Sequence, residues 1–351
     1  MSNFDKKFEK YTICRDGQIM LAKAARDNVE TVWQRYEQQQ PHCGFCEMGL
    51  SCRICNMGPC RIDPFGEGPQ KGVCGADADI MVARNLGRMI AAGAASHSDH
   101  GRDLVEVLEK VSEGKAPGYS IKDPEKLRRL AVEYSIDVSG KDDLKLAGEL
   151  AYAMQEDYGT RKKAITLLSR APEKRRALWE KAGIIPRGID RETSEMMHRT
   201  HMGVDNDWVN ILLHGLRNAL SDGWGGSMIA TEVSDILFGV PTPVKSTVNM
   251  GVLKEDHVNI VVHGHNPVVS ETVVSATQAP ELINLAMEKG AKGINLVGVC
   301  CTGNELMMRH GIPMAGNHLM TELVLVTGAV EMMIVDYQCI MPAVRDRKSV
   351  V

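Results

Sequence analysis

A dense group of cysteines near the N-terminus constrains this chain more than any other feature. Six of the ten cysteines lie within residues 43–74, a segment that is rich in glycine and proline and has no helical or strand periodicity. We expect metal ligation, rather than a hydrophobic core, to fix such a backbone. A reducing compartment keeps thiols free, so the group of cysteines predicts metal binding rather than disulfide bonds. The six are Cys43, Cys46, Cys52, Cys55, Cys60 and Cys74.

The rest of the composition indicates a cytoplasmic protein. The chain has 351 residues, of which 44% are hydrophobic and 25% charged, enough for two or three domains with sizeable cores. A net charge of -4 and the absence of a basic run argue against a nucleic-acid partner. The N-terminal residues have no apolar segment typical of a signal peptide, and apolar runs such as residues 258–262 are too short to span a membrane.

The last four cysteines of the segment, Cys52, Cys55, Cys60 and Cys74, are enough to hold one [4Fe–4S] cluster. Glycine and proline beside the last two favour iron, because tight turns and accessible N–H groups suit a bulky inorganic core. The alternative is a zinc site built from the first four cysteines of the segment. That alternative leaves the last two cysteines without a role.

Two cysteines, Cys43 and Cys46, are then left with half of a cluster site. A two-fold axis supplies every residue twice, so a cluster shared between two copies of the chain would complete the site. The sequence therefore predicts a homodimer bridged by an iron–sulfur cluster.

The chain divides into a helical part over residues 1–235 and an α/β part over residues 236–345. One amphipathic helix is predicted across residues 21–36, and helical periodicity returns from about residue 80. After residue 236, strands and helices alternate, which is typical of a parallel sheet. The predicted strands are 257–262, 294–299 and 332–335, and the predicted helices between them are 280–289 and 318–326.

Three potential metal ligands, His265, Cys301 and Cys339, each follow one of the three predicted strands. The carboxyl ends of parallel strands meet at one edge of a sheet, so these side chains are expected to converge there. Each residue alone is more often structural, since a lone cysteine at a strand end usually belongs to the core. Together they indicate a site for a soft metal.

Several segments together resemble the anaerobic nickel–iron carbon monoxide dehydrogenases. The resemblance extends from about Val32 to about Pro342. It implies a homodimer with a helical domain and two Rossmann-like domains that oxidises CO with water to CO2, two protons and two electrons, reversibly. The segments are CRICNMGPCRIDPFGEGPQKGVCGA, ARNLGRMIAAGAASHSDHG, MHRTHMGVD, ILFGVPTPV, VHGHNPVVSE, GVCCTGNELMMRHGIP and DYQCI.

The resemblance assigns roles to the N-terminal cysteines. The last four resemble the ligands of an electron-relay [4Fe–4S] cluster, and Cys43 resembles a ligand of the cluster that bridges the dimer. This chain has Ser51 where many family members have the second bridging cysteine, and Cys46 is present instead. The bridging cluster would then be a [4Fe–4S] or a smaller [2Fe–2S] cluster.

The resemblance also implies a nickel–iron–sulfur cluster as the active site. His265 and Cys301 resemble the ligands of the iron outside the cubane, and Cys339 resembles a ligand of a cubane iron. Cys300 would lie beside the cluster without binding it, and no role is predicted for Cys14.

Two histidines are expected to act in catalysis. His97 resembles the catalytic acid–base histidine, and His100 would continue a proton relay. The family often has further histidines where this chain has Asp103 and Glu106, so carboxylates would act there instead. Electrons would leave for a ferredoxin-like acceptor.

Family members continue well beyond the length of this chain, so we expect a truncated chain with an incomplete first Rossmann-like domain and no CO oxidation of its own. Residues 346–351 are expected to be a foreign tail, because their back-translation resembles a sequencing adapter. Two other functions remain open at this point. One is a hybrid-cluster hydroxylamine reductase, and the other is a non-enzymatic iron–sulfur or zinc scaffold.

Overall fold

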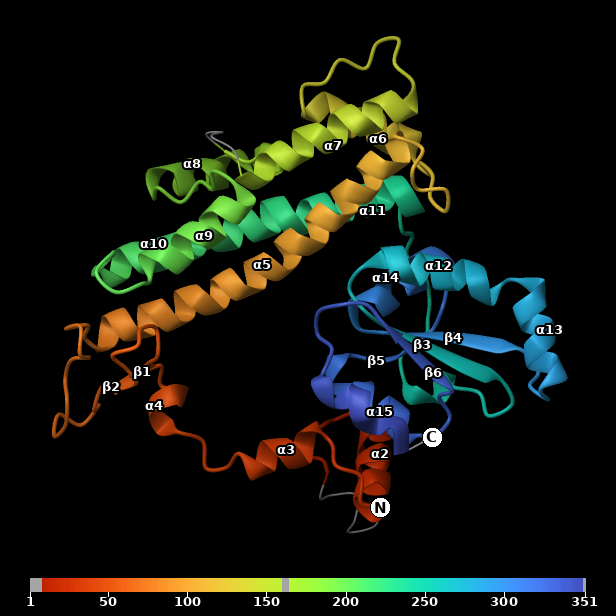
Figure 1. The fold of residues 1–351 in the computed structure, drawn as a ribbon, viewed down its shortest axis with the longest axis horizontal. Coiled ribbons are helices and arrows are strands. Elements are labelled where there is room, and N and C mark those ends of the chain that lie inside the picture. The colour runs from red at the N-terminus through yellow and green to blue at the C-terminus, as the bar shows by residue number, and fades with distance from the viewer. Residues whose placement is uncertain (1–7, 160–163, 350–351) are drawn as a thin grey trace. The chain divides into compact units, whose positions relative to one another are not determined.

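The structure is a computed structural model that describes residues 8–159 and 164–349. It divides into two compact units (Figure 1). Residues 41–239 form what we call the helical unit, and residues 1–40 together with 240–351 form the α/β unit. The predicted boundary at residue 235 lies close to the observed junction. Residues 1–40, however, group with the α/β part of the chain, which differs from the predicted division.

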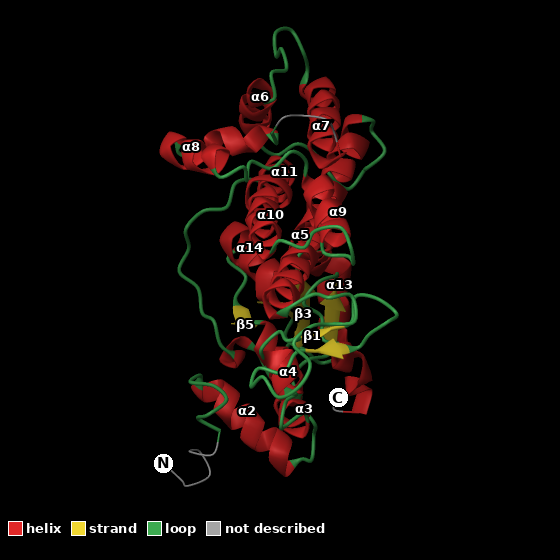
Figure 2. Cartoon of the chain, turned by 90° about the vertical axis from the view of Figure 1, so that its left-hand side faces the viewer, coloured by secondary structure: helices red, strands yellow, loops and turns green. Residues whose placement is uncertain are grey.

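The helical unit is organised around α5 (Ala78–Ser112), against which α7, α9, α10 and α11 pack. Asp77 caps α5 by accepting a hydrogen bond from the Ile80 N–H group at 3.0 Å, and Gly114 follows its end with φ +69°. Figure 2 shows how helices dominate this unit. The other elements are α4 (Gly44–Glu47), β1 (Ser51–Cys52), β2 (Cys60–Arg61), α6 (Pro124–Glu133), α7 (Asp143–Gly159), η1 (Thr166–Arg170), α8 (Glu173–Lys181), α9 (Ile189–Arg199), α10 (Trp208–Ser221), the π-helical turn η2 (Asp222–Gly226) and α11 (Ser227–Phe238).

The α/β unit is built on a parallel four-stranded sheet in the order β5-β4-β3-β6. The three predicted strands are confirmed as β3 (Val258–Gly264), β4 (Ile294–Val299) and β6 (Met332–Val335). The sheet also contains β5 (Met314–Gly316), which sequence periodicity did not predict. Further elements are η3 (Met250–Val252), α12 (Pro267–Thr277), α13 (Pro280–Glu288), α14 (Cys300–His310), η4 (His318–Met320), α15 (Thr321–Val326) and η5 (Pro342–Ser349).

The single helix predicted across residues 21–36 is wrong. The chain forms α2 (Arg15–Arg26) and α3 (Val32–Gln38), separated by a break in which Asn28 has φ +56°. Thr31 begins the second helix with a capping box that involves Gln34. A left-handed residue followed by a strong N-cap ends one helix and starts another, although the apolar spacing continues.

Packing explains why residues 1–40 belong to the α/β unit. Leu21 of α2 lies in one buried core with Val261 and Val297 of the sheet and with Val324 of α15. Each of these side chains is at most 1% exposed. Burying a leucine or valine contributes about 1.5–3 kcal/mol, so this core fixes α2 to the sheet-containing unit.

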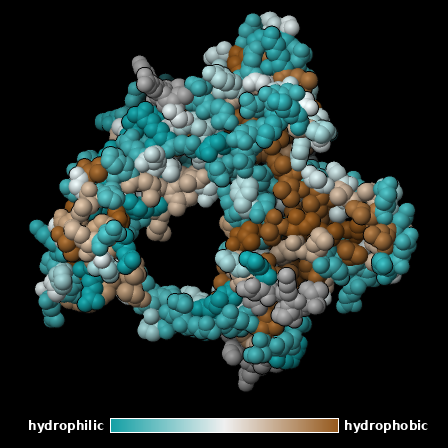
Figure 3. Space-filling view, in the orientation of Figure 1, coloured by the Kyte–Doolittle hydropathy of each residue, from teal (hydrophilic) through white to brown (hydrophobic). Residues whose placement is uncertain are grey.

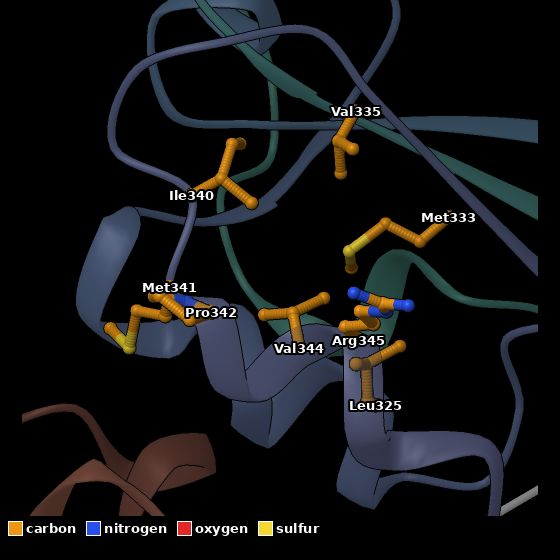
Figure 4. Close-up of a pocket in the computed structure, with 8 residues that line it drawn as sticks. All are labelled: Leu325, Met333, Val335, Ile340, Met341, Pro342, Val344 and Arg345. Atoms are coloured by element: carbon orange, nitrogen blue, oxygen red, sulfur yellow. The ribbon is translucent and has the colours of Figure 1, made fainter.

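The surface of the α/β unit is partly apolar. Figure 3 shows apolar surface over this unit, and Met332 of the edge strand β6 is 53% exposed. A pocket of about 500 Å³ lies between β6 and η5 (Figure 4). Its lining contains one charged side chain and none of the predicted site residues. The lining residues are Leu325, Met333, Val335, Ile340, Met341, Pro342, Val344 and Arg345.

Two further observations concern the ends and the membrane. Of the expected foreign tail at residues 346–351, the backbone is described through Ser349 within η5, and residues 350 and 351 lie outside the described residues. In the part of the chain that the structure describes, no helix is both long and apolar enough to cross a bilayer.

Candidate functional site

The cysteine segment of the helical unit is held by a short antiparallel pair. Cys52 of β1 lies opposite Cys60 of β2, and the N–H group of Val73 donates to the Cys60 sulfur at 3.4 Å. Gly72 is closely packed beside Cys60, since an added Cβ would lie 2.6 Å from the Met81 side chain and 3.6 Å from the Cys60 sulfur. Short loops and a backbone donor to sulfur are features that suit an iron–sulfur cluster.

The surroundings of Cys74 favour its thiolate form. Its pKa is lowered mainly by a hydrogen bond from the Ala76 backbone, and also by Arg84, whose Nη1 lies 3.9 Å from the sulfur. A thiol with a lowered pKa forms the thiolate, which is the form that binds metals. Sequence analysis missed Arg84, because an arginine within a helical pattern is normally assigned to the surface.

Cys43 and Cys46 lie at the start of α4, and both are exposed. Hydrogen bonds from Cys46, first from its backbone and then from its side chain, lower the pKa of Cys43. Ser51 donates from its hydroxyl to the Cys46 sulfur at 3.3 Å, and Asn85 of α5 donates to the Ser51 carbonyl at 2.9 Å. Ser51, where the resemblance predicted a second bridging cysteine, therefore contacts Cys46.

The spacing of these cysteines disfavours a single zinc ion. In the described residues, no three of the N-terminal cysteines form a group whose ligand atoms all lie within 4.8 Å of one another. Sulfurs bound at about 2.3 Å to one zinc ion cannot be more than about 4.6 Å apart. The cysteines are thus spread more widely than one ion would require.

The strand ends of the α/β unit do converge. In the register of the sheet, His263 of β3 lies beside Val299 of β4 and beside Val335 of β6. The residues that follow these strands therefore share one edge. Among the described residues, one group has its potential ligand atoms within 4.8 Å of one another: His265, Cys300 and Cys339.

The group of three combines an imidazole and two thiols. Nε2 of His265 lies 3.8 Å from the sulfur of Cys339. Cys300 and Cys339 both have left-handed backbones, with φ +64° and +56°. Non-glycine residues in this region are uncommon and cluster at functional sites. Sulfur and imidazole ligands fit soft or borderline metals and iron–sulfur clusters, so the donor set suits the predicted group.

Asp336 holds the two loops of this site together. Its carboxylate accepts hydrogen bonds from the N–H groups of His265 at 2.8 Å and Asn266 at 3.0 Å, and from the Thr302 hydroxyl at 3.1 Å. An added Cβ at Gly264 would collide with this carboxylate, so glycine is required there. Burial raises the pKa of Asp336. Sequence analysis missed Asp336, although its position directly after β6 is a signal.

The adjacent cysteines differ from the prediction in one respect. Cys300, expected to lie beside the cluster, is the one whose sulfur joins His265 and Cys339, while Cys301 is more exposed. The pKa values of the two thiols point the other way, to Cys301 as the more readily ionised cysteine. A hydrogen bond from Cys300 lowers the pKa of Cys301 to about 7, and the same bond raises the pKa of Cys300 to about 12. Geometry thus favours Cys300 as a ligand and charge favours Cys301.

The two predicted catalytic histidines lie on α5 in the helical unit. Nδ1 of His97 lies 2.9 Å from Oδ1 of Asp222, the first residue of the π-helical turn η2. This hydrogen bond raises the pKa of the half-buried His97. His100 follows at three-residue spacing and is partly buried, so both lie on one side of α5. Asp222 had no sequence signal beyond a glycine-rich stretch within a helix.

The π-helical turn approaches α5 very closely. A Cβ at Gly226 would lie 2.9 Å from the Ser98 N atom, and one at Gly101 would lie 2.6 Å from the Gly226 carbonyl oxygen. Only glycine permits this approach, which places the Asp222 carboxylate beside His97. Such turns occur frequently at functional sites.

A family model described as the Prismane/CO dehydrogenase family matches residues 50–350. The chain belongs to this family. The resemblance to carbon monoxide dehydrogenases is confirmed by their sequences. Carbon monoxide dehydrogenase 1 of Methanosarcina mazei is 61% identical over 336 residues, which are 96% of this chain and 53% of the relative.

Comparison with solved structures supports the same family membership. A nickel-free carbon monoxide dehydrogenase from Thermococcus sp. AM4 matches with a TM-score of 0.92 and 56% identity, covering 94% of this chain and 52% of that one. A chain of an acetyl-CoA synthase/carbon monoxide dehydrogenase with NiZn[Fe4S4] and NiNi[Fe4S4] clusters matches with a TM-score of 0.91 and 44% identity, covering 97% and 50%. The chain spans about half the length of the relatives it matches.

Proposed function

We propose that this chain is part of an enzyme that oxidises CO with water to CO2, two protons and two electrons, reversibly, at a nickel–iron–sulfur cluster. The observation that supports this most directly is the convergence of His265, Cys300 and Cys339 at adjacent strand ends in a chain of this family. The relatives named carbon monoxide dehydrogenase do not favour the hydroxylamine reductase alternative. Electrons would pass through iron–sulfur clusters to a ferredoxin-like acceptor.

In the active centre, His265, Cys301 and Cys339 would hold the metal cluster, with Cys300 in a position to replace or assist Cys301. The bound cluster would supply Lewis-acid activation of water and would accept electrons. Asp336 keeps the backbone of His265 in place, because the His265 N–H group donates to both oxygens of its carboxylate, at 2.8 and 3.0 Å. The α/β unit would be the first Rossmann-like domain of the enzyme.

His97 would accept and return protons of the reaction. Its Nδ1 is held by Asp222, so Nε2 is the nitrogen that would exchange the proton. The raised pKa makes His97 a better base than an ordinary histidine. His100 and the carboxylates of Asp103 and Glu106 would pass protons onward along α5.

Activity is tested by CO-dependent reduction of a viologen dye under anaerobic conditions. We expect activity from a protein that combines this sequence with the remaining length of its relatives, and none from the 351-residue chain by itself, because three ligands do not hold a nickel–iron–sulfur cluster. CO oxidation by the 351-residue chain alone would contradict this proposal. Reduction of hydroxylamine without CO oxidation would favour the alternative.

Cys52, Cys55, Cys60 and Cys74 would hold a [4Fe–4S] relay cluster. Anaerobic expression should therefore give a brown chain that contains iron and acid-labile sulfide. Cys60→Ala should lower the iron content, because its sulfur accepts the Val73 hydrogen bond inside the cysteine loops. Cys14→Ala, which changes an exposed cysteine in the α/β unit, is the matched control. Equal iron in both variants would mean that the ligands are assigned wrongly.

Cys43 and Cys46 would share a [4Fe–4S] or [2Fe–2S] cluster with the same residues of a second chain, giving a homodimer. Dimer and cluster would then depend on each other. The double variant Cys43→Ala/Cys46→Ala should be monomeric by analytical ultracentrifugation and should contain less iron. A dimer of unchanged stability in this variant would refute the bridging role.

A further inference from the structure

Arg84 is a buried cation in the cysteine-binding end of the helical unit. It lies on α5, only 2% of it is exposed, and it is one of the largest fully buried side chains among the described residues. A guanidinium remains charged at every physiological pH. Burying such a charge is costly unless an anion and hydrogen-bond acceptors neutralise it. The chain must therefore provide Arg84 with a negative partner.

The described residues provide no carboxylate for this purpose. Nη1 of Arg84 donates to the Cys74 sulfur at 3.9 Å, and Nη2 donates to the Asn206 side-chain oxygen at 3.5 Å. Nε is buried and has no hydrogen-bond partner in the described part of the chain. Both contacts are long, and Asn206 is neutral. Of the described groups that Arg84 contacts, the thiol of Cys74 is therefore the one that can become an anion.

Arg88, one turn further along α5, provides a comparison. It is partly exposed, and it donates to the Thr200 hydroxyl at 3.0 Å and to the Met197 carbonyl at 3.3 Å. Solvent and neutral oxygens satisfy this second guanidinium. The two arginines lie on the same helix and have the same charge, but only Arg84 is directed at a cysteine sulfur.

We propose that Arg84 is the counter-ion of the relay cluster and that its charge raises the cluster's reduction potential. This inference rests on the proposed role of Cys74 as a cluster ligand. A cubane held by four thiolates is negatively charged, and it gains one more negative charge when it accepts an electron. A fixed positive charge in a buried site stabilises the reduced form more than the oxidised form.

Other local dipoles act in the same direction. Backbone N–H groups donate to the sulfurs of Cys60 and Cys74, and α5 begins at Ala78, four residues after Cys74. Hydrogen bonds to cluster sulfurs are a recognised way to adjust the potential. Arg84 would add a full charge to these partial ones. The electron it helps to retain is the one that the relay cluster receives from the active centre and gives to the acceptor.

The test is a redox titration of the relay cluster that is monitored by electron paramagnetic resonance. Iron and acid-labile sulfide are measured per chain. It uses the 351-residue chain carrying Cys43→Ala/Cys46→Ala, so that the bridging cluster does not contribute. Arg84→Gln removes the charge, Arg84→Lys keeps it without the planar fork, and Arg88→Gln is the matched control. We expect the midpoint potential to fall in Arg84→Gln, to change less in Arg84→Lys, and to change least in Arg88→Gln.

The outcomes separate this inference from the proposed function. A parent chain without iron and sulfide would contradict the relay cluster itself. The parent chain here is the chain with Cys43→Ala/Cys46→Ala and an unchanged Arg84. If it and the Arg84→Gln variant both contain the cluster with the same midpoint potential, only the counter-ion role is overturned. An equal fall in Arg84→Gln and Arg88→Gln would also overturn it, because the effect would then be one of net charge.

Loss of the cluster from Arg84→Gln is resolved by a second measurement. Urea unfolding of the cluster-free chains compares the parent with Arg84→Gln. If Arg84 is a counter-ion, the cluster-free variant is at least as stable as the cluster-free parent, because a buried charge without its anion has been removed. If the cluster-free variant is clearly less stable, Arg84 is only a packing residue and the inference fails.

Discussion

Glu192 on α9 is a fully buried carboxylate at the centre of an ion-pair network in the helical unit. It accepts hydrogen bonds from Arg217 at 2.7 Å, from the backbone N–H of Arg187 at 2.8 Å, and from Nε2 of His214 at 3.1 Å. Burial alone would raise the pKa of Glu192, but the bonds from His214 and Arg187 outweigh burial and hold the pKa well below its usual range. The network joins α9 to α10, and both pack on α5.

Replacing Glu192 by glutamine keeps the shape and removes the charge. One amide oxygen cannot accept all of these bonds, and the amide NH2 group would face other donors. Removing one partner of a buried ion pair costs about 3–5 kcal/mol. Glu195 also pairs with both arginines, so we expect the lower end, about 3 kcal/mol. For a unit of this size the melting temperature should fall by roughly 6–12 °C.

Urea and thermal unfolding, followed by tryptophan fluorescence, measure this effect. The signal reports mainly on the helical unit, because three of the four tryptophans, Trp179, Trp208 and Trp224, belong to it. The matched control is Glu195→Gln, in the same network but partly exposed, which should cost less than Glu192→Gln because solvent screens its ion pairs. If both variants lose the same stability, burial of Glu192 is not what makes its charge important.

Three further predictions concern single residues. Asp222→Asn should lower the pKa of His97, measured by NMR titration of the imidazole, because the carboxylate bond that raises it is lost; an unchanged titration would show that the contact does not act on His97. Asp336→Ala should speed hydrogen exchange at the His265 amide about tenfold or more, since a bond to a charged group contributes about 1.5–3 kcal/mol; an unchanged rate would refute its role in holding the loop. The pKa of Glu195 falls from 4.5 to about 2 in the folded chain, so its contribution to stability is fully present above about pH 4.5 and is lost as the pH falls toward 2. Acid unfolding of Glu195→Gln should therefore depend less on pH across this window, and an identical profile would contradict the shift.

Much of the α/β unit could be predicted because its signals are local. Strands such as residues 294–299 are short apolar runs, and a residue that follows a parallel strand must lie at the sheet edge, so the position of His265 followed from the pattern alone. β5 (Met314–Gly316) could not be predicted, because three residues are too few to show alternation. The break at Asn28 was missed because the apolar spacing continues through it.

The partners of the site residues were harder to predict than the residues themselves. Cysteines and histidines attract notice by their type, whereas Arg84 and Asp222 become informative only through the groups they face. Cys74 lies ten residues from Arg84, and His97 lies 125 residues from Asp222. Such pairs depend on how helices and loops pack. A single sequence, taken without its relatives, contains no record of that packing.

The grouping of residues 1–40 with 240–351 sets an order for folding. The N–H group of Val32 donates to the Glu322 carboxylate, a contact that spans 290 residues, and Leu21 shares its core with Val324. Contacts of this range close late, because the loop entropy must be overcome first. The helical unit is continuous in sequence and can fold during synthesis, whereas α2 must wait on the ribosome until α15 has emerged. The segment that forms α2 is therefore translated long before it reaches its native contacts.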